Sequence, residues 1–452
     1  MGIHYFFSII IRFLLPFCLL FSSLANAKNI RIIRDSEAET TIRILAAPIF
    51  KAAQLNPDNV QIRLVEDNSL NAFVAGGQRI FINSGLIMQT QSPEQLIGVI
   101  AHETGHIEGG HLTRVRSAME HSSAATILSA IIGAAVTVGT GRGDLTKAII
   151  AGGGEYARRA FMQFSRSQEN AADQAALRLL DKTKQSARGL LQFMKLLRNE
   201  ELLLTIGKDP YVITHPLTTE RINAINAHIE SSPFSDTKIS RALRKKFNRM
   251  RAKITGFVQD PALTFRQYEK QDSTPSSLYA RAYAHYKKSN FDKALHLIDK
   301  LIKQNPDDPY YYEFRGHILF NNGQIGKAIN AYETANILAP HEPLIKIDLA
   351  RIQIESGDPN LLGQAITNLK QALHKERYSA SSWRLLGIAY GRKGEKGRSS
   401  LALAESAMLV GRAKEAAFHA KRATHFFPKH SPEWLKGQDI LLAIQSKNQK
   451  KE

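Results

Sequence analysis

The sequence predicts a two-part molecule: a mixed α+β domain over residues 28–235, followed by an all-helical solenoid over residues 275–445. Three observations predict this division. With 452 residues, the chain is too long for one compact core. The first part mixes patterns typical of strands and of helices. The second part has helical patterns only, and small residues recur in it at a fixed spacing.

The first 27 residues have the pattern of a secretory signal peptide. A weakly basic start and an apolar run lead to Ala25 and Ala27, two small residues that precede Lys28. This pattern predicts cleavage after Ala27, with an uncleaved membrane anchor as the alternative. Cys18, the single cysteine of the sequence, lies in this segment, so the remaining chain would have no disulfide. That composition is compatible with an oxidising compartment such as the bacterial periplasm.

The chain is strongly basic. Its formal net charge is +19, and the predicted signal contains one arginine and no acid, which leaves +18. A charge of this sign favours anionic surfaces. Because an exported chain meets little nucleic acid, we expect contact with membrane surfaces and none with nucleic acid. The densest basic run, residues 238–253, contains eight Lys or Arg residues and no acid. We interpret it as a solvated helix face within a basic linker, residues 236–274.

Two local patterns follow one another in the first domain. The segment LNAFVAGGQRIFINSGLI, residues 70–87, predicts a hairpin with Gly76-Gly77 as its turn. The segment Ser92-Pro93-Glu94-Gln95 then predicts the start of a helix, because serine suits the N-cap, proline the first turn and glutamine the capping box. Apolar residues carry this helix into the core.

The same helix contains a metal-binding pattern, VIAHETGHIEGGHLTR, residues 99–114. His102 and His106 are four residues apart, so both lie on one helix face and can bind one Zn²⁺ at about 2.0–2.1 Å. Glu103 follows the first histidine, where it can act as the base for an attacking water. The alternative is two buried histidines on an amphipathic helix, since this short pattern also occurs by chance.

A third ligand decides between these interpretations. One class of zinc site takes a histidine three residues after Gly109, but Leu112 stands there and His111 is one position early. We therefore interpret His111 as a helix-end residue. A second class takes a glutamate from a later helix, and the segment SRSQENAADQAALRLLD supplies Glu169, with Asp173 one turn on. Glu169 can bind the metal while Asp173 accepts the spare N–H of a ligand histidine. An ordinary acidic helix face is the alternative.

The second part of the chain has a period of 34 residues. Ala282, Ala294 and Pro306 recur as Gly316, Ala328 and Pro340, and the same 12-residue spacing returns as Ala404, Ala416 and Pro428. This period is typical of tetratricopeptide repeats (TPR), in which small residues let paired helices approach and proline ends the second helix. We count four units, or five. Such a solenoid binds partners and performs no chemistry. Because its repeats contact mainly their neighbours, we expect the first domain to fold without them.

Together these motifs resemble the BepA-like family of exported zinc metallopeptidases with a C-terminal TPR array. The catalytic domains of that family are akin to the HtpX and CAAX-type endopeptidases. The resemblance covers nearly the whole chain after the signal. It rests on the histidine pair with Glu103, on Glu169 with Asp173, and on the segment THPLTTERI, residues 214–222, followed by the repeats.

The resemblance implies a zincin-type α+β catalytic domain of the gluzincin class, with one Zn²⁺ per chain. It implies that His215 lies near the zinc, where it assists the transition state or blocks the water, and that Arg221 buttresses the site. It also implies a periplasmic endopeptidase with a chaperone-like role, which degrades stalled outer-membrane β-barrel proteins and works at their assembly machinery. A hairpin arm, Phe73–Ala75 or Arg79–Ile82, could pair with an extended substrate, or the hairpin could be interior.

Two further hypotheses stay open at this point. The chain could be a TPR scaffold or chaperone with a latent peptidase domain, or a peptidase of the inner membrane. The hypothesis of an inner-membrane peptidase needs a membrane span. Residues 122–141 are the candidate because they are uncharged and 20 residues long. A single crossing there would separate Glu169 from His102 and His106. We therefore expect a mobile lid or helical hairpin beside the active-site cleft, which could touch a membrane surface without crossing it.

Overall fold

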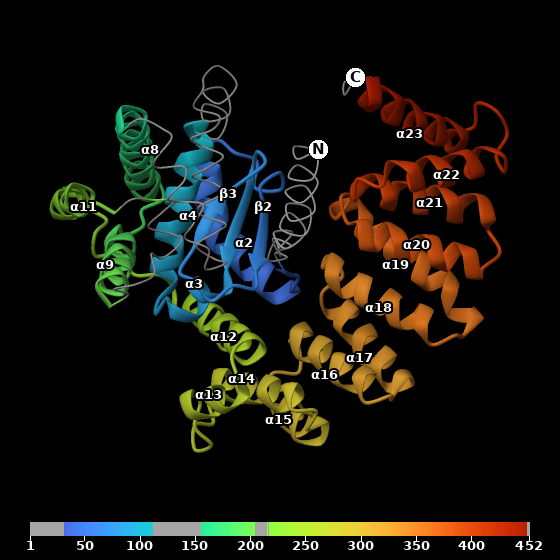
Figure 1. Ribbon diagram of the computed structural model, residues 1–452. Helices are drawn as coiled ribbons and strands as arrows, with labels where there is room; N and C mark the ends of the chain where they lie inside the picture. The colour runs from blue at the N-terminus through green and yellow to red at the C-terminus, as the bar shows by residue number, and fades with distance from the viewer. Residues whose placement is uncertain (1–30, 112–154, 204–214, 216, 450–452) are drawn as a thin grey trace, which may run out of the picture.

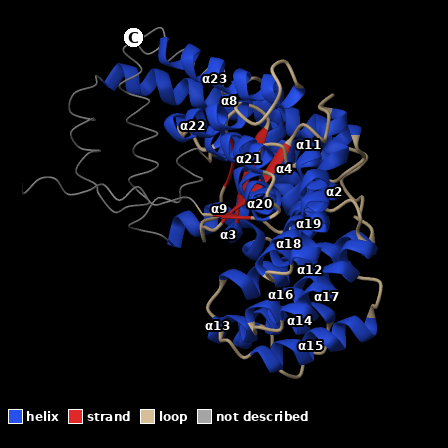
Figure 2. Ribbon diagram, turned by 90° about the vertical axis from the view of Figure 1, so that its right-hand side faces the viewer, coloured by secondary structure: helices blue, strands red, loops and turns tan. Residues whose placement is uncertain are grey.

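The computed structural model describes residues 31–111, 155–203, 215 and 217–449 (Figure 1). The predicted signal peptide and the segment 122–141 lie outside these residues. Among the described helices, none is both long enough and apolar enough to cross a bilayer. The prediction of an α+β domain followed by a helical solenoid is confirmed. Figure 2 shows the strands as one small group among the helices.

A four-stranded mixed sheet lies in the first domain, in the order β1-β2-β4-β3. Its strands are β1 (Ile32–Ile33), β2 (Gln61–Val65), β3 (Ala72–Val74) and β4 (Arg79–Asn83). The predicted hairpin is confirmed, because β3 pairs with β4 in antiparallel register. Strand β4 also pairs with β2 in parallel register, so both of its edges are used. Strand β3 is an edge strand of this sheet.

Along β2 and β4, buried apolar residues alternate with more exposed residues, so the sheet has one buried face. Ile62, Leu64, Ile80 and Ile82 are at most 1% exposed and belong to the main core. Helices α2 (Ser36–Ala52) and α4 (Pro93–Glu108) contact the sheet and each other. The short helix α3 (Ser84–Gln89) joins β4 to this layer.

Helix α4 begins where the sequence predicts. Ser92 is the N-cap residue and Pro93 is the first helical residue. The capping box differs in detail from the expectation, because the Ser92 side chain makes no capping hydrogen bond and Gln95 Oε1 instead accepts from the backbone N–H of Gln91. Helices α8 (Glu155–Lys182) and α9 (Arg188–Leu203) pack against α4, and α11 (Thr219–Ser231) packs on α8 and α9. Helix α4 is therefore the centre of the domain.

The basic run forms helix α12 (Arg241–Val258), which has one buried face rather than an entirely solvated one. Phe247, Met250 and Ile254 belong to the core of the first domain. Helix α12 contacts α2, α3 and α4 on one side and the first solenoid helix on the other. A short helix, α13 (Pro261–Gln267), follows it. The expected linker is therefore a packed junction, while the exact domain boundaries stay a prediction.

Ten helices follow α13 and pack in sequence order as five consecutive pairs, which agrees with the larger of the two predicted unit counts. Their bounds are α14 (Pro275–Lys287), α15 (Phe291–Gln304), α16 (Pro309–Asn321), α17 (Ile325–Leu338), α18 (Pro343–Glu355), α19 (Leu362–Lys375), α20 (Ala380–Arg392), α21 (Lys396–Leu409), α22 (Ala413–Thr424) and α23 (Pro432–Gln449). A short 3₁₀ turn, η1 (Pro359–Leu361), precedes α19. The periodic small residues lie where helices meet: a Cβ on Gly316 would be 2.4 Å from the Tyr332 ring.

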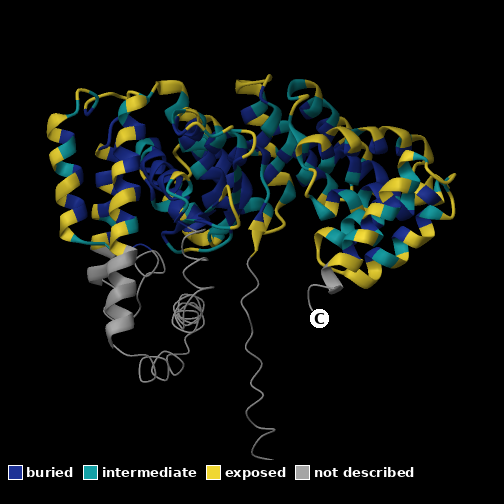
Figure 3. Ribbon diagram, turned by 90° about the horizontal axis from the view of Figure 1, so that it is seen from above, coloured by how far each residue is buried: buried dark blue, intermediate teal, exposed yellow. Residues whose placement is uncertain are grey.

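The solenoid curves beside the first domain (Figure 1), and buried residues run through the interior of both halves (Figure 3). The two halves meet at α2, which contacts α18, and at α12, which contacts α14. Charged pairs cross this junction: Arg34 contacts Glu376 at 2.9 Å, and Lys253 of α12 contacts Glu313 of α16 at 4.0 Å. The junction places the repeats on the side of α2, away from α8 and α9.

Candidate metal centre

The candidate site lies where α4 crosses α8. The two helices approach so closely that a Cβ on Gly105 would lie 2.7 Å from the backbone oxygen of Ala172. A glycine is therefore needed inside the histidine motif itself. This crossing brings His102 and His106 from α4 against Glu169 from α8, although the two helices are far apart in sequence.

Three donors expected from the sequence meet at one point. Nε2 of His102 and Nε2 of His106 are 3.1 Å apart, and each lies 3.3 Å from a carboxylate oxygen of Glu169. His102 is fully buried, Glu169 is 3% exposed and His106 is 9% exposed. Together with His215, these side chains form a buried group whose donor atoms lie within 4.8 Å of one another, close enough to hold one metal ion.

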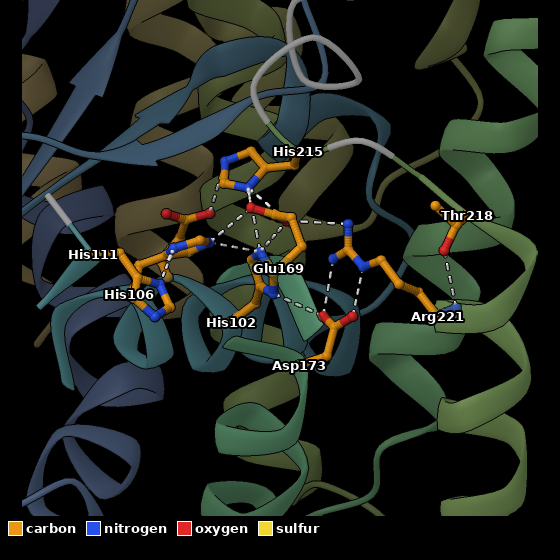
Figure 4. Close-up of polar contacts among 9 residues, drawn as sticks. His102, His106, His111, Glu169, Asp173, His215, Thr218 and Arg221 are labelled. Atoms are coloured by element: carbon orange, nitrogen blue, oxygen red, sulfur yellow. Dashed lines mark hydrogen bonds and ion pairs between the residues drawn. The ribbon is translucent and has the colours of Figure 1, made fainter. Parts of the chain in front are cut away.

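A second set of contacts orients the two histidine rings (Figure 4). Nδ1 of His102 lies 2.9 Å from Oδ1 of Asp173, and Nδ1 of His106 lies 2.9 Å from Nδ1 of His111. Each ring therefore uses Nδ1 for a fixed partner and turns Nε2 toward the cluster, which is the arrangement found around protein metal ions. The donor set of two imidazoles and a carboxylate suits Zn²⁺.

Arg221 links the two acidic residues of α8. Its Nε and Nη2 donate to the two carboxylate oxygens of Asp173, at 2.6 and 2.9 Å, and its Nη1 lies 3.0 Å from Glu169. Arg221 is the third helical residue of α11, and its backbone N–H donates to the N-cap residue Thr218. A guanidinium in this position fixes both carboxylates by charge and by paired hydrogen bonds.

His215 lies inside the cluster rather than only beside it. Its Nδ1 is 3.1 Å from both carboxylate oxygens of Glu169 and 3.3 Å from Nε2 of His102. Its Nε2 is 3.6 Å from Oε1 of Glu103. The imidazole therefore lies between the carboxylates of Glu169 and Glu103.

Glu103 is the charged group of the site that the protein leaves unsatisfied. Its side chain is fully buried, and neither carboxylate oxygen has a hydrogen-bond partner in the described part of the chain. An unsatisfied buried carboxylate is unfavourable and is rarely retained without a role. A water or substrate between Glu103 and a metal would satisfy it.

Burial and neighbouring charges separate the pKa values of the site. Burial raises the pKa of Glu103 above its usual value, whereas the imidazoles around Glu169 overcome burial and hold its pKa well below the usual value. For His102, burial is outweighed by the hydrogen bonds to Asp173 and Glu169, which raise its pKa to about 10. Burial dominates at His106 and lowers its pKa to about 3. Metal binding at His102 would therefore release a proton.

The sequence of this domain matches that of a known peptidase family: peptidase family M48 over residues 34–229. Residues 34–229 therefore form a metallopeptidase domain of the M48 type. A second match, to the tetratricopeptide repeat, covers residues 279–343 and confirms the predicted repeats. The matched range includes strands β2 to β4, the crossing of α4 with α8 and the whole cluster.

Two curated relatives share both parts of the chain. The putative beta-barrel assembly-enhancing protease of Vibrio cholerae is 26% identical over 76% of this chain and 70% of its own length. The beta-barrel assembly-enhancing protease of Escherichia coli is 22% identical over 78% of this chain and 72% of its own. Among solved structures, MamA aligns with 37% of this chain and 96% of its own at 16% identity, with a TM-score of 0.28. The family matches and the two curated relatives confirm the expected metallopeptidase with C-terminal tetratricopeptide repeats.

The structure brings together every residue that the sequence analysis named for the site. His111 is at the helix end, as expected, but the sequence analysis missed its contact with His106. Gly109 and Gly110 are the signals that could have revealed it. A Cβ on Gly109 would lie 2.3 Å from the His111 ring, and Gly110 has a φ of +60°, so the chain turns back and returns His111 to the helix.

Proposed function

We propose that this protein is a zinc-dependent endopeptidase, with one Zn²⁺ held by His102, His106 and Glu169. The observation that carries the proposal is the convergence of these three donors beside the unsatisfied, buried carboxylate of Glu103. Asp173, His111 and Arg221 support the three donors from outside. A bound Zn²⁺ would supply Lewis acidity to the scissile carbonyl and to the attacking water.

The residues of the chain supply the rest of the chemistry. Glu103 takes the proton of the attacking water and later delivers it to the leaving amine. Its raised pKa suits this exchange, because a general base works best when its pKa is near the working pH. Arg221 and Asp173 keep the two donor helices in register. Burial of the whole cluster excludes bulk water and strengthens each of these interactions.

We propose unfolded or stalled outer-membrane β-barrel proteins as substrates. The names of the two curated relatives support this choice. The outer edge of β3 offers a position for an extended chain, since it has no strand partner among the described residues, whereas β4 is paired on both sides. An extended substrate would add to the sheet beside α4 through main-chain hydrogen bonds. The repeats would bind the barrel-assembly machinery.

The same proposal includes the periplasm as the location. The predicted signal, with cleavage after Ala27, and the names of the relatives support it. The net charge of +19 supports peripheral contact with anionic membrane surfaces.

A second candidate is a TPR chaperone whose peptidase is latent at rest. The position of His215 favours it, because the imidazole lies where a water or a substrate carbonyl would have to approach the cluster. The two functions are compatible if His215 moves away when substrate binds.

Zinc analysis and proteolysis together test the proposal. Purified protein should contain one Zn²⁺ per chain and cleave an unfolded outer-membrane β-barrel protein. Glu103→Gln should abolish cleavage and retain the zinc, because glutamine keeps the shape of the base and cannot take the proton. His102→Ala or Glu169→Ala should lose the zinc as well. Wild-type protein that neither contains zinc nor takes it up would contradict the assignment.

A further inference from the structure

The C-terminal repeats contain a pocket of about 460 Å³ that the peptidase site does not use. It lies between α19 and α21, with α20 beneath it and α23 at one end. Its floor is apolar: Leu373, Leu386 and Leu401 are buried, and the half-buried Trp383 lies among them. A pocket with such a floor accepts a large apolar side chain.

The rim of this pocket is basic. Lys370, Arg398 and Lys436 line it, and Glu433 is the single carboxylate among the lining residues. Arg398 is paired with Glu395 at 2.8 Å. Lys370 and Lys436 form no salt bridge with any described residue, and both side chains are exposed. Two cations are therefore available to a ligand that enters the pocket.

A second pocket, of about 400 Å³, lies one repeat earlier, between α17 and α19. Amide side chains line most of its polar part, and Glu333 is the single carboxylate among its lining residues. Gln353, 1% exposed, donates to Gln364 Oε1 at 3.1 Å and accepts from Asn368 Nδ2 at 3.2 Å. These bonds leave the Nε2 group of Gln364 and the Oδ1 atom of Asn368 without a partner within the described ranges. One donor and one acceptor held in this way match the needs of a peptide group.

The two pockets share helix α19 as a wall, so together they form one surface. Packed helices lie about 8–10 Å apart, and the α19 residues of the two pockets are about seven positions, or about 10 Å, apart along the helix. An extended chain advances about 3.3 Å per residue, so about four residues would join the pockets. We propose that this surface binds an extended, acidic segment of an unfolded polypeptide. The segment's backbone contacts the amides, one large apolar side chain enters the basic-rimmed pocket, and flanking carboxylates contact Lys370 and Lys436.

Charge complementarity selects this occupant over a second copy of the chain. The protein has a net charge of +19, so a second copy would bring positive charge against a positive rim. An acidic segment instead pairs with the two available lysines and is attracted from a distance. This inference concerns binding alone and does not depend on the peptidase site being active.

The two tryptophans of the chain provide a direct measurement. Trp383 lies in the pocket floor, so Trp434→Phe leaves one fluorescent reporter there. The experiment uses the full chain with Trp434→Phe and Glu103→Gln, so that the probe is not cleaved. The probe is a short unstructured peptide with one Phe flanked by Asp residues. We expect a saturable change in Trp383 emission, which is lost when the Phe is replaced by Ala.

Lys370→Glu with Lys436→Glu should weaken this binding by at least about tenfold, because like charges would then face each other. The matched control is Lys293→Glu with Lys300→Glu, two exposed lysines on α15, which should bind as the parent does. All four changes are on the surface, and equal melting temperatures would establish that both variants are folded.

Three results would overturn the proposal. The first is unchanged affinity after the charge reversal at Lys370 and Lys436. The second is equal binding of a peptide with Lys in place of Asp. The third is a change in Trp383 emission that follows protein concentration without peptide, which would assign the surface to a second copy of the chain.

Discussion

His102 and His106 each use one ring nitrogen for the cluster and the other for a partner that fixes the ring. The partner of His102 is a carboxylate held by Arg221, whereas the partner of His106 is the imidazole of His111. The hydrogen bond to Asp173 helps to raise the pKa of His102, whereas the pKa of His106 is lowered by burial. The two histidines are therefore unequal although they come from one motif.

The fixed partners should matter for metal affinity. Asp173→Ala and His111→Ala should each weaken zinc binding by about 10–100-fold, because each leaves a ligand ring free to rotate. Competition with a coloured chelator measures this affinity. His296→Ala, an exposed histidine on α15, is the control and should leave the affinity unchanged. If His111→Ala also leaves it unchanged, the contact with His106 has no role in holding the ring.

His215 provides a test of latency. Since its imidazole covers the cluster beside Glu103, His215→Ala should raise the rate of cleavage of an unfolded protein while the zinc content stays at one per chain. A fall in rate with full zinc content would instead assign His215 to stabilisation of the transition state. An unchanged rate would contradict both roles.

At this scale the sequence could predict residues whose chemistry depends on short spacing. His102, Glu103 and His106 are recognised from one helical turn, and Glu169 with Asp173 from another. His215 has no such local pattern, and only the family resemblance drew attention to it. The role of His111 depends on a reversal of the chain at Gly110, which a helical spacing cannot show.

Helix crossings, rather than individual residues, set the distances in the cluster. Gly105 allows α8 to lie against α4, and Gly98 allows α9 to do so, since a Cβ there would lie 2.7 Å from the backbone nitrogen of Leu190. The sequence predicted the helix that begins after Ser92 and the hairpin at Gly76-Gly77, because capping and turn residues are local. It did not predict the pairing of β2 with β4, because parallel pairing joins segments without a local turn.

Gly105→Ala should therefore damage the site without changing a donor. The added methyl group would be 2.7 Å from the Ala172 oxygen, so the helices must separate, at a cost of about 1–3 kcal/mol. We expect a lower melting temperature and weaker zinc binding, measured on the same preparations. Gly326→Ala is the control, because a Cβ at that helical position meets nothing within 4 Å. If the Gly105→Ala variant had normal stability and zinc affinity, the crossing of α4 with α8 would have room for the added methyl group.

On the scale of the whole molecule, the peptidase domain and the repeats share buried charges. Glu37 on α2 is fully buried and contacts Arg249 and Lys253 of α12, and Tyr279 of the first repeat donates to it at 3.0 Å. Arg249 also contacts Asp308, which precedes α16. The expectation that the first domain folds without the repeats assumed that repeats contact mainly each other. The first repeats here also cover Glu37, so we expect their removal to destabilise the peptidase domain.

Glu37 provides the sharpest test of this junction. Glu37→Gln removes the charged partner of the buried Lys253 and of the partly buried Arg249, which should lower the free energy of unfolding by about 3–5 kcal/mol. The control is Glu66→Gln, whose partner Arg31 has a 76% exposed side chain, and the expected change is at most about 1 kcal/mol. Urea denaturation at neutral pH measures both variants. Equal effects at the two positions would show that the junction adds no stability.

The pH dependence of the same variant follows from the pKa of Glu37. Burial alone would raise that pKa, but the charges of Arg249 and Lys253 outweigh burial and hold it below its usual value. A carboxylate with a lowered pKa stabilises the folded state above the unfolded value, about 4.3, and this stabilisation is lost as the pH falls through the folded value. The difference in free energy of unfolding between the wild-type protein and Glu37→Gln should therefore become smaller as the pH is lowered into the acid range. A difference that persists undiminished below the folded pKa would show that the effect of the substitution is steric rather than electrostatic.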